Sequence, residues 1–563
     1  MSFPLNIADR LRTSAEAVPS QRAVVFPDGR DHAGRVTYTQ LTFRQLDEMA
    51  DAIARGLASM GVRPGHRLAM FVPPSLESIA LTFGIFRSGA ACTLIDPGMG
   101  RSNVFRCLEQ CPPDGFVAIP LVQTIRRMRF FKYRRARLNV VVSKKSAPWT
   151  GAISMDELLR RGRDSSIALP QTQNTDPAAI IFTSGSTGPP KGVCYEHGMF
   201  DAQVDLIRDR FGIRPGEIDL PGFPLFALFN VAMQVTTVIP DMDPTRPANV
   251  DPEKILEAIE NQGVTQAFGS PALWNQVGRY CEQHNIRLPT LKRILSAGAP
   301  VPNHVLSRMT ATLSEDADLF TPYGATECLP VAAIGGRQVL RETAAETARG
   351  AGTCVGSVFD RMSVRIIPVT FEPIDRLQDV TILDRGQIGE IIIQGPVATR
   401  EYFQQPEATA LAKIPDGETF WHRMGDVGYL DDQNRLWFCG RKAHIVFTKS
   451  GPLYSVCCEA IFNQHPEVYR CALVGLGDRV TQRQTPALVV EPEPGCFPAD
   501  SEAEDRFRSQ LLEIGRADVR TAEIRQIHFQ KTLPVDTRHN VKINREALAE
   551  QLARTLEKTS GPQ

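Results

Sequence analysis

Two hydrophobic patterns alternate along the chain between residues 44 and 300. Apolar positions recur with a helical period over 44–60 (RQLDEMADAIARGLASM), whereas 67–73 (RLAMFVP) is a short apolar run typical of a buried strand. The same order, a helical segment followed by apolar runs, is found again at ILEAIENQG (255–263), which is followed by VTQAFGS and then LKRILSAGAP. Strands that alternate with helices at this spacing predict parallel sheets in an α/β domain. Ligands of such sheets bind where loops leave the carboxyl ends of the strands, so a site is expected there.

The pattern changes beyond residue 360. Three short strands with turn residues between them, SVRIIPV, GEIIIQG and RLWFCGR, predict a small antiparallel piece. After Arg441 the strands CALVGLG, PALVVEP and IRQIHFQ alternate with helices expected at 455–464, 503–516 and 545–557. The predicted fold class is therefore α/β. A large N-terminal domain of parallel α/β subdomains and a small β-rich piece (1–440) precedes a small α+β C-terminal domain (441–563).

Length and charge narrow the class of protein. The 563 residues are long for a single core, and 42% apolar with 22% charged residues is ordinary for a globular chain. Lys+Arg and Asp+Glu both number 63, which argues against a bulk preference for nucleic acid or an anionic surface. The most apolar run, 79–95, is too short for a membrane span and contains Arg87, so we expect a buried helix ending at Gly89 and then a strand.

The N-terminal residues and the cysteines indicate the cellular compartment in which the protein is expected. The first residues lack a basic segment followed by an apolar one, so no signal peptide is predicted. The twelve cysteines form no C-x-x-C pair, and the adjacent Cys457 and Cys458 are interpreted as small apolar helix residues. We expect a reduced, cytoplasmic protein.

A glycine- and hydroxyl-rich loop follows the predicted strand 179–183 (AIIFT). The stretch TSGSTGPPKG presents backbone N–H groups and hydroxyls around one concave spot, which favours phosphate. Its glycines allow close backbone approach, and Lys191 offers a point charge. No Gly-Lys-Ser/Thr triplet closes the loop, so it is not a Walker loop. A plain surface turn is the alternative, but the density of hydroxyls and glycines beside a buried strand favours a phosphate site.

This loop resembles the phosphate loop of the acyl-adenylate-forming (ANL) superfamily, which holds acyl-CoA synthetases, luciferases and the adenylation domains of peptide synthetases. Further landmarks of that superfamily follow in its order along nearly the entire chain. SAGAP (296–300) is similar to its adenine-binding turn and YGATE (323–327) to its central motif. GD (425–426) is similar to its ribose-binding motif, and RHNVKINR (538–545) to its C-terminal lysine motif.

The resemblance implies the chemistry of the site. ATP and a carboxylic acid form an acyl-adenylate, and cancelling the charge between two anions requires Mg²⁺ and nearby cations. Glu327 is implied as the Mg²⁺ ligand, Thr326 as an α-phosphate contact and Lys542 as the catalytic lysine. Lys442 occupies the position about which the small domain swings between half-reactions. The residues implied to bind ATP or AMP are Thr183, Ser184, Gly185, Ser186, Thr187, Gly188, Lys191, Gly298, Ala299, Pro300, Tyr323, Gly324, Asp426 and Arg441.

The acyl acceptor is inferred from positions at which this sequence differs from the superfamily members that use CoA. Their P-L-F-H-x-x-G motif stands here as PLFALFN, with Ala227 in place of histidine and Asn230 in place of glycine. After Lys442 the usual acidic run is KAHIVFTKSG, with His444 where an acid is usual, and of E-x-E only Glu459 remains. These changes weaken the case for a pantetheine tunnel.

Two longer stretches resemble the β-lactone synthetases of bacterial long-chain olefin biosynthesis: DLPGFPLFALFN with TVIPDMDPTRPANVDP, and LPVDTRHNVKINRE. The resemblance implies adenylation of a long-chain 2-alkyl-3-hydroxy fatty acid, whose own β-hydroxyl then displaces AMP and closes a β-lactone without CoA. A long-chain acyl-CoA ligase is the main alternative, followed by a carrier-protein ligase. A non-catalytic scaffold with a decayed site is opposed by the retained Lys191, Glu327, Asp426 and Lys542.

The segment 126–145 (RRMRFFKYRRARLNVVVSKK) is strongly basic. It has nine Lys or Arg residues, and no Asp or Glu occurs from 115 to 155. One interpretation is a solvated basic face whose interleaved aromatic residues pack in the core. The other is a peripheral contact with anionic lipid headgroups, or with a partner enzyme that handles the same apolar substrate.

Overall fold

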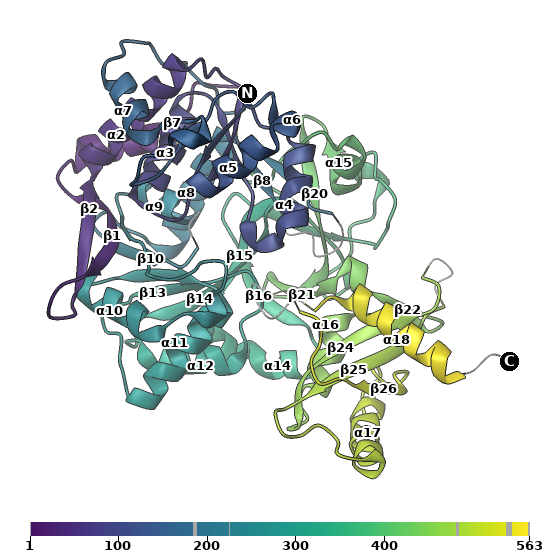
Figure 1. The fold of residues 1–563 in the computed structure, drawn as a ribbon. Coiled ribbons are helices and arrows are strands. Elements are labelled where there is room, and N and C mark those ends of the chain that lie inside the picture. Colours follow the sequence, from purple (N-terminus) through teal and green to yellow (C-terminus); the bar gives the residue numbers. More distant parts are fainter. Residues whose placement is uncertain (1, 184–188, 224–225, 480–482, 536–542, 561–563) are drawn as a thin grey trace.

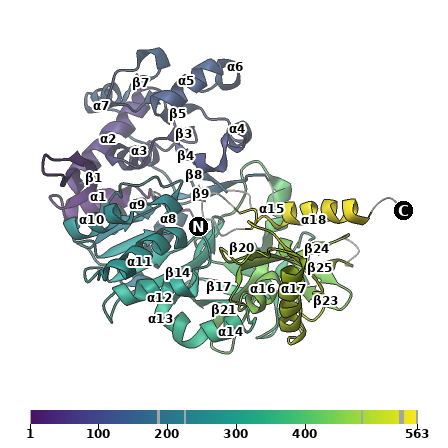
Figure 2. The ribbon, with the colours of Figure 1, turned by 60° about the horizontal axis from the view of Figure 1, so that its bottom comes forward.

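The computed structural model describes residues 2–183, 189–223, 226–479, 483–535 and 543–560 (Figure 1). Two large sheets and a smaller C-terminal sheet, each packed with helices, make up the chain. In both ribbon views the C-terminal strands and helices α16–α18 lie beside the large N-terminal part rather than within it (Figures 1 and 2).

A seven-stranded sheet forms the first subdomain, and all of its pairings are parallel except β8–β9. Its strands in spatial order are β7 (Ile153–Ser154), β6 (Val140–Val141), β5 (Gly115–Ala118), β3 (Arg67–Phe71), β4 (Ala91–Leu94), β8 (Pro177–Phe182) and β9 (Gly192–Glu196). Its helices are α2 (Phe43–Ser59), α3 (Leu76–Arg87), α4 (Arg101–Gln110), α5 (Pro120–Met128), α6 (Phe130–Tyr133), α7 (Met155–Arg163) and α8 (His197–Phe211). The predicted buried helix and strand within 79–95 are α3 and β4, and they are confirmed.

The pairing of α2 with α3 shows how sequence dictates local packing. Thr42 and Gln45 form a capping box at the start of α2, satisfying N–H groups that the first turn leaves without partners. Gly84 in α3 lies against α2 so closely that an added Cβ would be 2.4 Å from a methyl carbon of Ile53. The two helices bury Ile53, Phe83 and Phe86 between them and the sheets.

A fourteen-stranded sheet runs through the rest of the large part. From β11 to β14 the pairings are parallel, and from β14 to β18 they are antiparallel. In spatial order its strands are β17 (Ser363–Ile367), β18 (Gly389–Gln394), β20 (Thr419–Leu430), β21 (Arg435–Arg441), β16 (Thr353–Val358), β15 (Cys328–Gly335), β14 (Asp318–Ala325), β13 (Arg293–Ser296), β12 (Gln266–Gly269), β10 (Ile218–Pro221), β11 (Thr236–Val238), β1 (Arg22–Arg30) and β2 (Val36–Thr42), with β19 (Lys413–Asp416) on β20. The antiparallel strands expected after residue 360 are thus present, but as a continuation of this sheet.

The helices of this second region follow the predicted alternation. They are α9 (Phe226–Ala232), α10 (Pro252–Gln262), α11 (Pro271–His284), α12 (Asn303–Thr312), α13 (Gly336–Gln338), α14 (Ala344–Ala348) and α15 (Pro406–Ala412), while α1 (Asp9–Ala17) begins the chain. Trp274 of α11 is fully buried in the core that α10, α11 and α12 share with strands β10, β12 and β13. No helix among the described residues is long and apolar enough to cross a membrane.

The C-terminal part has its own core. Strands β24 (Val468–Leu476), β25 (Thr485–Pro492) and β26 (Gln526–Phe529) form a three-stranded sheet, and β22 (Val446–Thr448) pairs with β23 (Gly451–Leu453). Helices α16 (Ser455–Phe462), α17 (Ser501–Arg516) and α18 (Arg545–Ser560) lie close to the predicted positions. Cys457 and Cys458 are buried in α16, as expected for apolar helix residues. The division at Arg441–Lys442 stays a prediction, although β21 ends at Arg441.

Candidate active site

One large cavity collects the residues singled out from the sequence. It measures about 2490 Å³ and opens between the two large sheets and the C-terminal part. All of the described candidates line it, namely Thr183, Lys191, Gly298, Ala299, Pro300, Tyr323, Gly324, Thr326, Glu327, Asp426, Arg441 and Lys442. Ser184, Gly185, Ser186, Thr187, Gly188 and Lys542 lie outside the described residues. Motifs separated by hundreds of residues therefore meet in one place.

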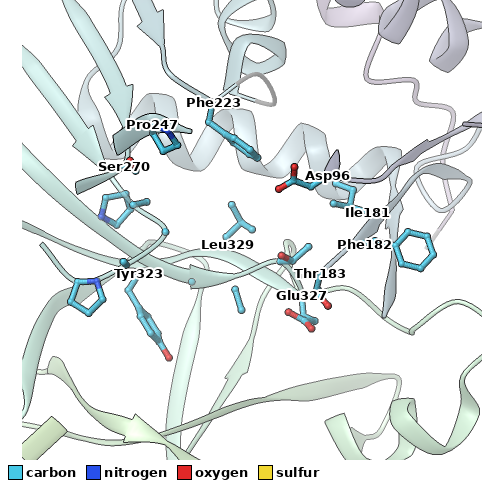
Figure 3. A pocket seen from close by; sticks show the side chains of 18 of the residues that line it. Asp96, Ile181, Phe182, Thr183, Phe223, Pro247, Ser270, Tyr323, Glu327 and Leu329 are labelled. Carbon is cyan, nitrogen blue, oxygen red and sulfur yellow. The ribbon is translucent and has the colours of Figure 1, made fainter. Parts of the chain in front are cut away.

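Strand ends bring these residues together. Thr183 follows β8, and Gly298 follows β13 with a φ of +97°, a conformation that suits glycine. Tyr323 lies near the end of β14, while Glu327 lies in the turn between β14 and β15. Figure 3 shows Thr183 and Glu327 side by side, with Tyr323 further along the same wall. The location at the carboxyl ends of parallel strands agrees with the general rule for α/β sheets.

Asp426 is the centre of a buried charge cluster. Its Oδ2 accepts a hydrogen bond of 2.5 Å from the hydroxyl of Tyr323, and its Oδ1 lies 2.9 Å from Nη1 of Arg441. Burial and the neighbouring carboxylate raise the pKa of Tyr323 well above its usual value, and Asp426 raises the pKa of Arg441. A carboxylate offers about four lone pairs, so Asp426 can still accept from a ligand hydroxyl.

Glu327 is held by a residue that the sequence did not single out. The hydroxyl of Tyr402 donates to Oε1 of Glu327 at 2.8 Å, and Nζ of Lys191 lies 4.8 Å from the centre of the Tyr402 ring. Tyr402 thus links the carboxylate to the lysine of the glycine-rich loop, which is 211 residues earlier in the chain. No periodicity or spacing points to Tyr402, because only the tertiary contact gives it this position.

The backbone beside Glu327 is also anchored. The amide and hydroxyl of Thr399 both donate to the carbonyl oxygen of Glu327, at 2.9 and 3.0 Å. The hydroxyl of Tyr195 donates to the carbonyl oxygen of Thr326 at 2.5 Å. These bonds fix the turn from both sides, so the two side chains face the cavity from a rigid support.

Behind Thr399 lies a buried basic pair that sequence reasoning also missed. Nζ of Lys413 donates to the carbonyl oxygen of Thr399 and lies 3.0 Å from Nδ1 of His422. Burial lowers the pKa of Lys413 to about 8, and burial together with Lys413 lowers the pKa of His422 well below its usual value. His422 is therefore neutral near pH 7, and Lys413 supports Thr399, which in turn holds the turn that carries Glu327.

Glu327 is the carboxylate that the sequence singled out as a metal ligand. Among the described parts of the chain, no group of three or more His, Cys, Asp or Glu side chains is placed to hold a metal ion. Mg²⁺ is commonly bound by one or two carboxylates together with the phosphates of a substrate and water. Glu327, beside Thr183 and Lys191 of the glycine-rich loop, fits that mode of binding.

Lys442, the expected hinge, is tied to the large part by a buried carboxylate. Its Nζ lies 2.7 Å from Oε1 of Glu390, which is fully buried and also binds Arg423 at 2.8 Å. From the C-terminal side, Arg479 donates to the carbonyl oxygens of Lys442 and Ala443 at 2.8 and 2.6 Å. The segment is thus clamped by one side chain from each side of the predicted boundary.

Replacing Glu390 with glutamine is expected to lower the free energy of unfolding by roughly 3 kcal/mol or more, because it leaves the buried Arg423 and the partly buried Lys442 without their carboxylate. Urea unfolding followed by circular dichroism measures the change. Glu346→Gln is the matched control, since its ion pair with Arg349 is exposed and should contribute little. Equal unfolding midpoints for the two variants would show that the Glu390 cluster is not important for stability.

The positions that depart from CoA-using enzymes have structural partners. Asn230 is buried and donates to Asp219 at 2.6 Å and to Thr237 at 3.2 Å. Glu459 forms a 2.7 Å ion pair with Arg545, and both line the cavity. Burial and the nearby Arg545 lower the pKa of His444 to about 3, so this residue cannot replace the charge of the usual acid.

Comparisons with known proteins agree with this geometry. The AMP-binding enzyme family matches residues 11–403. The olefin beta-lactone synthetase of Xanthomonas campestris pv. campestris is 45% identical over 556 residues, covering 98% of each chain. That of Stenotrophomonas maltophilia is 46% identical over 569 residues, covering 99% of this chain and 100% of its own. Among solved structures, the anthranilate CoA ligase AuaEII in complex with anthranoyl-AMP is similar with a TM-score of 0.76 at 18% identity, over 98% of both chains.

Proposed function

Because the chain belongs to the AMP-binding enzyme family, we propose that it adenylates a long-chain 2-alkyl-3-hydroxy fatty acid with ATP and closes it to a β-lactone. The observation that carries the proposal is the identity of 45–46% over nearly the full chain to two olefin beta-lactone synthetases. The chain is an ATP-dependent, acyl-adenylate-forming enzyme, and its substrate is a small-molecule acid. We further propose that this acid carries two alkyl chains and a β-hydroxyl group.

In the first step the carboxylate attacks the α-phosphate of ATP and pyrophosphate leaves. We assign phosphate binding to Thr183, Lys191 and the intervening loop, and the α-phosphate contact to Thr326. The adenine would lie beside Gly298–Pro300 and Tyr323, with the ribose hydroxyls on Asp426. The support is that all of these described residues line one cavity and are held in place by the contacts above.

Mg²⁺ belongs to this proposal as the ion that Glu327 would hold. When bound it would neutralise charge between the two anions that must approach each other. The hydroxyl of Tyr402 keeps the carboxylate oriented toward the cavity, so little reorganisation is needed on binding.

In the second step the β-hydroxyl attacks the adenylated carbonyl carbon, the bond to AMP breaks, and the hydroxyl proton passes to a base or water. No second substrate is required, because nucleophile and electrophile lie on one molecule. Well-oriented intramolecular reactions reach effective molarities of roughly 10⁵ M or more, which offsets ring strain. The enzyme has only to fold the chain and exclude water, which would otherwise hydrolyse the adenylate.

The cavity is large and apolar enough for such an acid. Its volume of about 2490 Å³ is well above the roughly 300–1,000 Å³ of an ordinary small-molecule pocket. One wall is formed by α8, where Phe200, Ile207 and Phe211 face the cavity, and another by α4 and α5. Two apolar walls on different elements suit an acid whose two alkyl chains diverge from neighbouring carbons.

Product analysis tests the function. With ATP, Mg²⁺ and a 2-alkyl-3-hydroxy fatty acid, we expect AMP, pyrophosphate and a β-lactone, with the same yield when CoA is omitted. A matched fatty acid without the hydroxyl should be adenylated and then stall, at no more than one equivalent of acyl-AMP per enzyme apart from slow hydrolysis. Mass spectrometry of the products and pyrophosphate release measure both outcomes.

The competing acyl-CoA ligase predicts the reverse result. It would turn over the plain fatty acid, and only with CoA present. Rapid thioester formation from the plain acid, with no lactone from the hydroxy acid, would overturn the proposal. A carrier-protein ligase would form AMP continuously only when a carrier thiol is supplied.

Contacts beyond the substrate are also proposed. The basic segment 126–145 would meet either anionic lipid headgroups or an enzyme that handles the same apolar substrate. The other interpretation of this segment is a solvated basic face whose aromatic residues pack in the core, and the exposure of these residues tests it. Tyr133 is buried as that interpretation expects, but Phe130 and Phe131 are exposed, so it is wrong for these two.

A further inference from the structure

Helix α5 buries two polar side chains, Gln123 and Arg126, and exposes two apolar ones, Leu121 and Met128. Gln123 is fully buried and donates to the carbonyl oxygens of Phe116 and Val140 at 2.9 and 2.8 Å. Arg126, also buried, donates to the carbonyl oxygen of Thr150 at 2.8 Å. This arrangement is the reverse of an ordinary surface helix, which buries its apolar stripe.

The outward side of α5 and the short helix α6 carry an exposed apolar surface. The relative exposures are 66% for Leu121, 81% for Met128, 57% for Phe130 and 89% for Phe131. Tyr133 anchors α6 from below, with its ring 5.3 Å from that of Phe116 in an edge-to-face contact. Because inward hydrogen bonds fix α5 and a buried ring fixes α6, the exposure is built into the fold. We refer to Leu121, Met128, Phe130 and Phe131 as the α5–α6 patch.

Exposed cations alternate in sequence with the residues of the α5–α6 patch. Arg127, Arg129, Lys132, Arg134 and Arg135 are exposed on the same two helices and just beyond them. Glu109 of α4 lies close and pairs with Lys132 at 2.6 Å, and no acid occurs between 115 and 155. Large exposed apolar side chains interspersed with exposed cations match an anionic lipid surface, in which the apolar groups enter the headgroup region and the cations meet phosphates.

The α5–α6 patch is continuous with the substrate cavity. Val104, Phe105 and Leu108 of α4 line that cavity, and so do Leu121, Val122, Ile125 and Met128 of α5. Both ribbon views place α4, α5 and α6 together on the first subdomain (Figures 1 and 2). Leu121 and Met128 thus belong to both the exposed surface and the cavity wall, which makes the gap between α4 and α5 an apolar path from the surface to the site.

We propose that the groove between α4 and α5 is the entrance of the acyl cavity, and that the α5–α6 patch docks this entrance on an anionic lipid surface. The inference rests on the proposed function in one respect, that the acid carries long alkyl chains. Such an acid partitions into lipid rather than water, so an entrance seated on the lipid avoids transferring it through solvent. A partner protein would need carboxylates to match these cations, and it is the alternative outcome of the test.

The first experiment measures binding of the full-length protein to vesicles in low salt, without turnover. Wild-type protein should bind vesicles of phosphatidylglycerol and phosphatidylcholine and ignore phosphatidylcholine alone. Phe130→Ser/Phe131→Ser should bind at least roughly tenfold more weakly. Arg134→Gln/Arg135→Gln should lose roughly fivefold for each arginine.

Matched controls separate docking from general surface properties. Val519→Ser removes an apolar side chain that is 90% exposed on the C-terminal part, and Arg516→Gln/Arg525→Gln removes two exposed charges there. Both controls should bind like the wild type. The docking proposal is overturned if the wild type ignores the anionic vesicles, if the controls weaken binding as much as the patch variants, or if the patch instead mediates association between protein chains.

A second experiment tests the entrance itself through pyrophosphate release. Ile125→Trp narrows the groove, so it should slow the reaction of a long-chain acid several-fold relative to a short soluble acid, while vesicle binding stays normal. An unchanged ratio of the two rates would overturn the entrance. Vesicle binding and the first turnover of pyrophosphate release do not depend on whether a lactone or a thioester forms afterwards, so these results can fail while the proposed function holds, and the reverse.

Discussion

Glu327→Gln is expected to reduce pyrophosphate release by at least roughly 10²-fold, because a metal ion at this site supplies several kcal/mol of charge stabilisation and a neutral amide holds a hard cation poorly. The substitution keeps the shape of the side chain and an oxygen that can accept from Tyr402. Folding should therefore be preserved, and the loss should come with a higher Mg²⁺ requirement. Steady-state rates over a range of Mg²⁺ concentrations measure both effects.

Tyr402→Phe is the matched control for Glu327→Gln. It removes the 2.8 Å hydrogen bond that orients the carboxylate but leaves the charge in place. The expected loss is smaller, roughly tenfold, because the charge stays in place and only the lower end, about 1.5 kcal/mol, of what a hydrogen bond to a charged group contributes is lost. If Glu327→Gln kept both its rate and its Mg²⁺ dependence, the metal ion would have to be held by another residue.

Lys542→Ala is expected to slow acyl-AMP formation by roughly 10²-fold or more, the cost of losing one preorganised cation where negative charge develops. Lys542 lies outside the described residues, which resume at Ile543. Ile543 pairs with Val535 as an antiparallel bridge, and Ile543 and Arg545 line the cavity. The residue that follows Lys542 in the sequence is therefore part of the cavity wall.

Single-turnover measurement of acyl-AMP formation tests this expectation. Lys531→Ala is a suitable control, because it removes an exposed lysine from the same end of the chain outside the motif. Thermal unfolding of both variants should match the wild type. An adenylation rate that Lys542→Ala leaves unchanged would remove this lysine from the catalytic assignment and leave the charge to Lys191 and Arg441.

Local physical chemistry explains why much of the fold could be predicted from the sequence. The helical period of 44–60 and the apolar run of 67–73 became α2 and β3, since such patterns depend only on which face a segment buries. Gly89 ended the helix in 79–95 as expected, and the motif order predicted the residues that gather in the cavity. What the local pattern could not show was that the antiparallel strands continue the large sheet, because strand neighbours are chosen by contacts between distant segments.

The sequence by itself indicated the class of chemistry of this protein, because its motifs resemble those of the acyl-adenylate-forming superfamily in the same order, and each motif is a run of adjacent residues. Only the tertiary structure identified Tyr402 as the partner of Glu327, and Glu390 as the partner of Lys442. It also showed that Phe130 and Phe131 of α6 point outward rather than into the core. The physical reason is that orientation and partnership are set by long-range packing. In α5 the buried bonds of Gln123 and Arg126 decide which face meets solvent, and those bonds reach strands and turns that lie elsewhere in the chain.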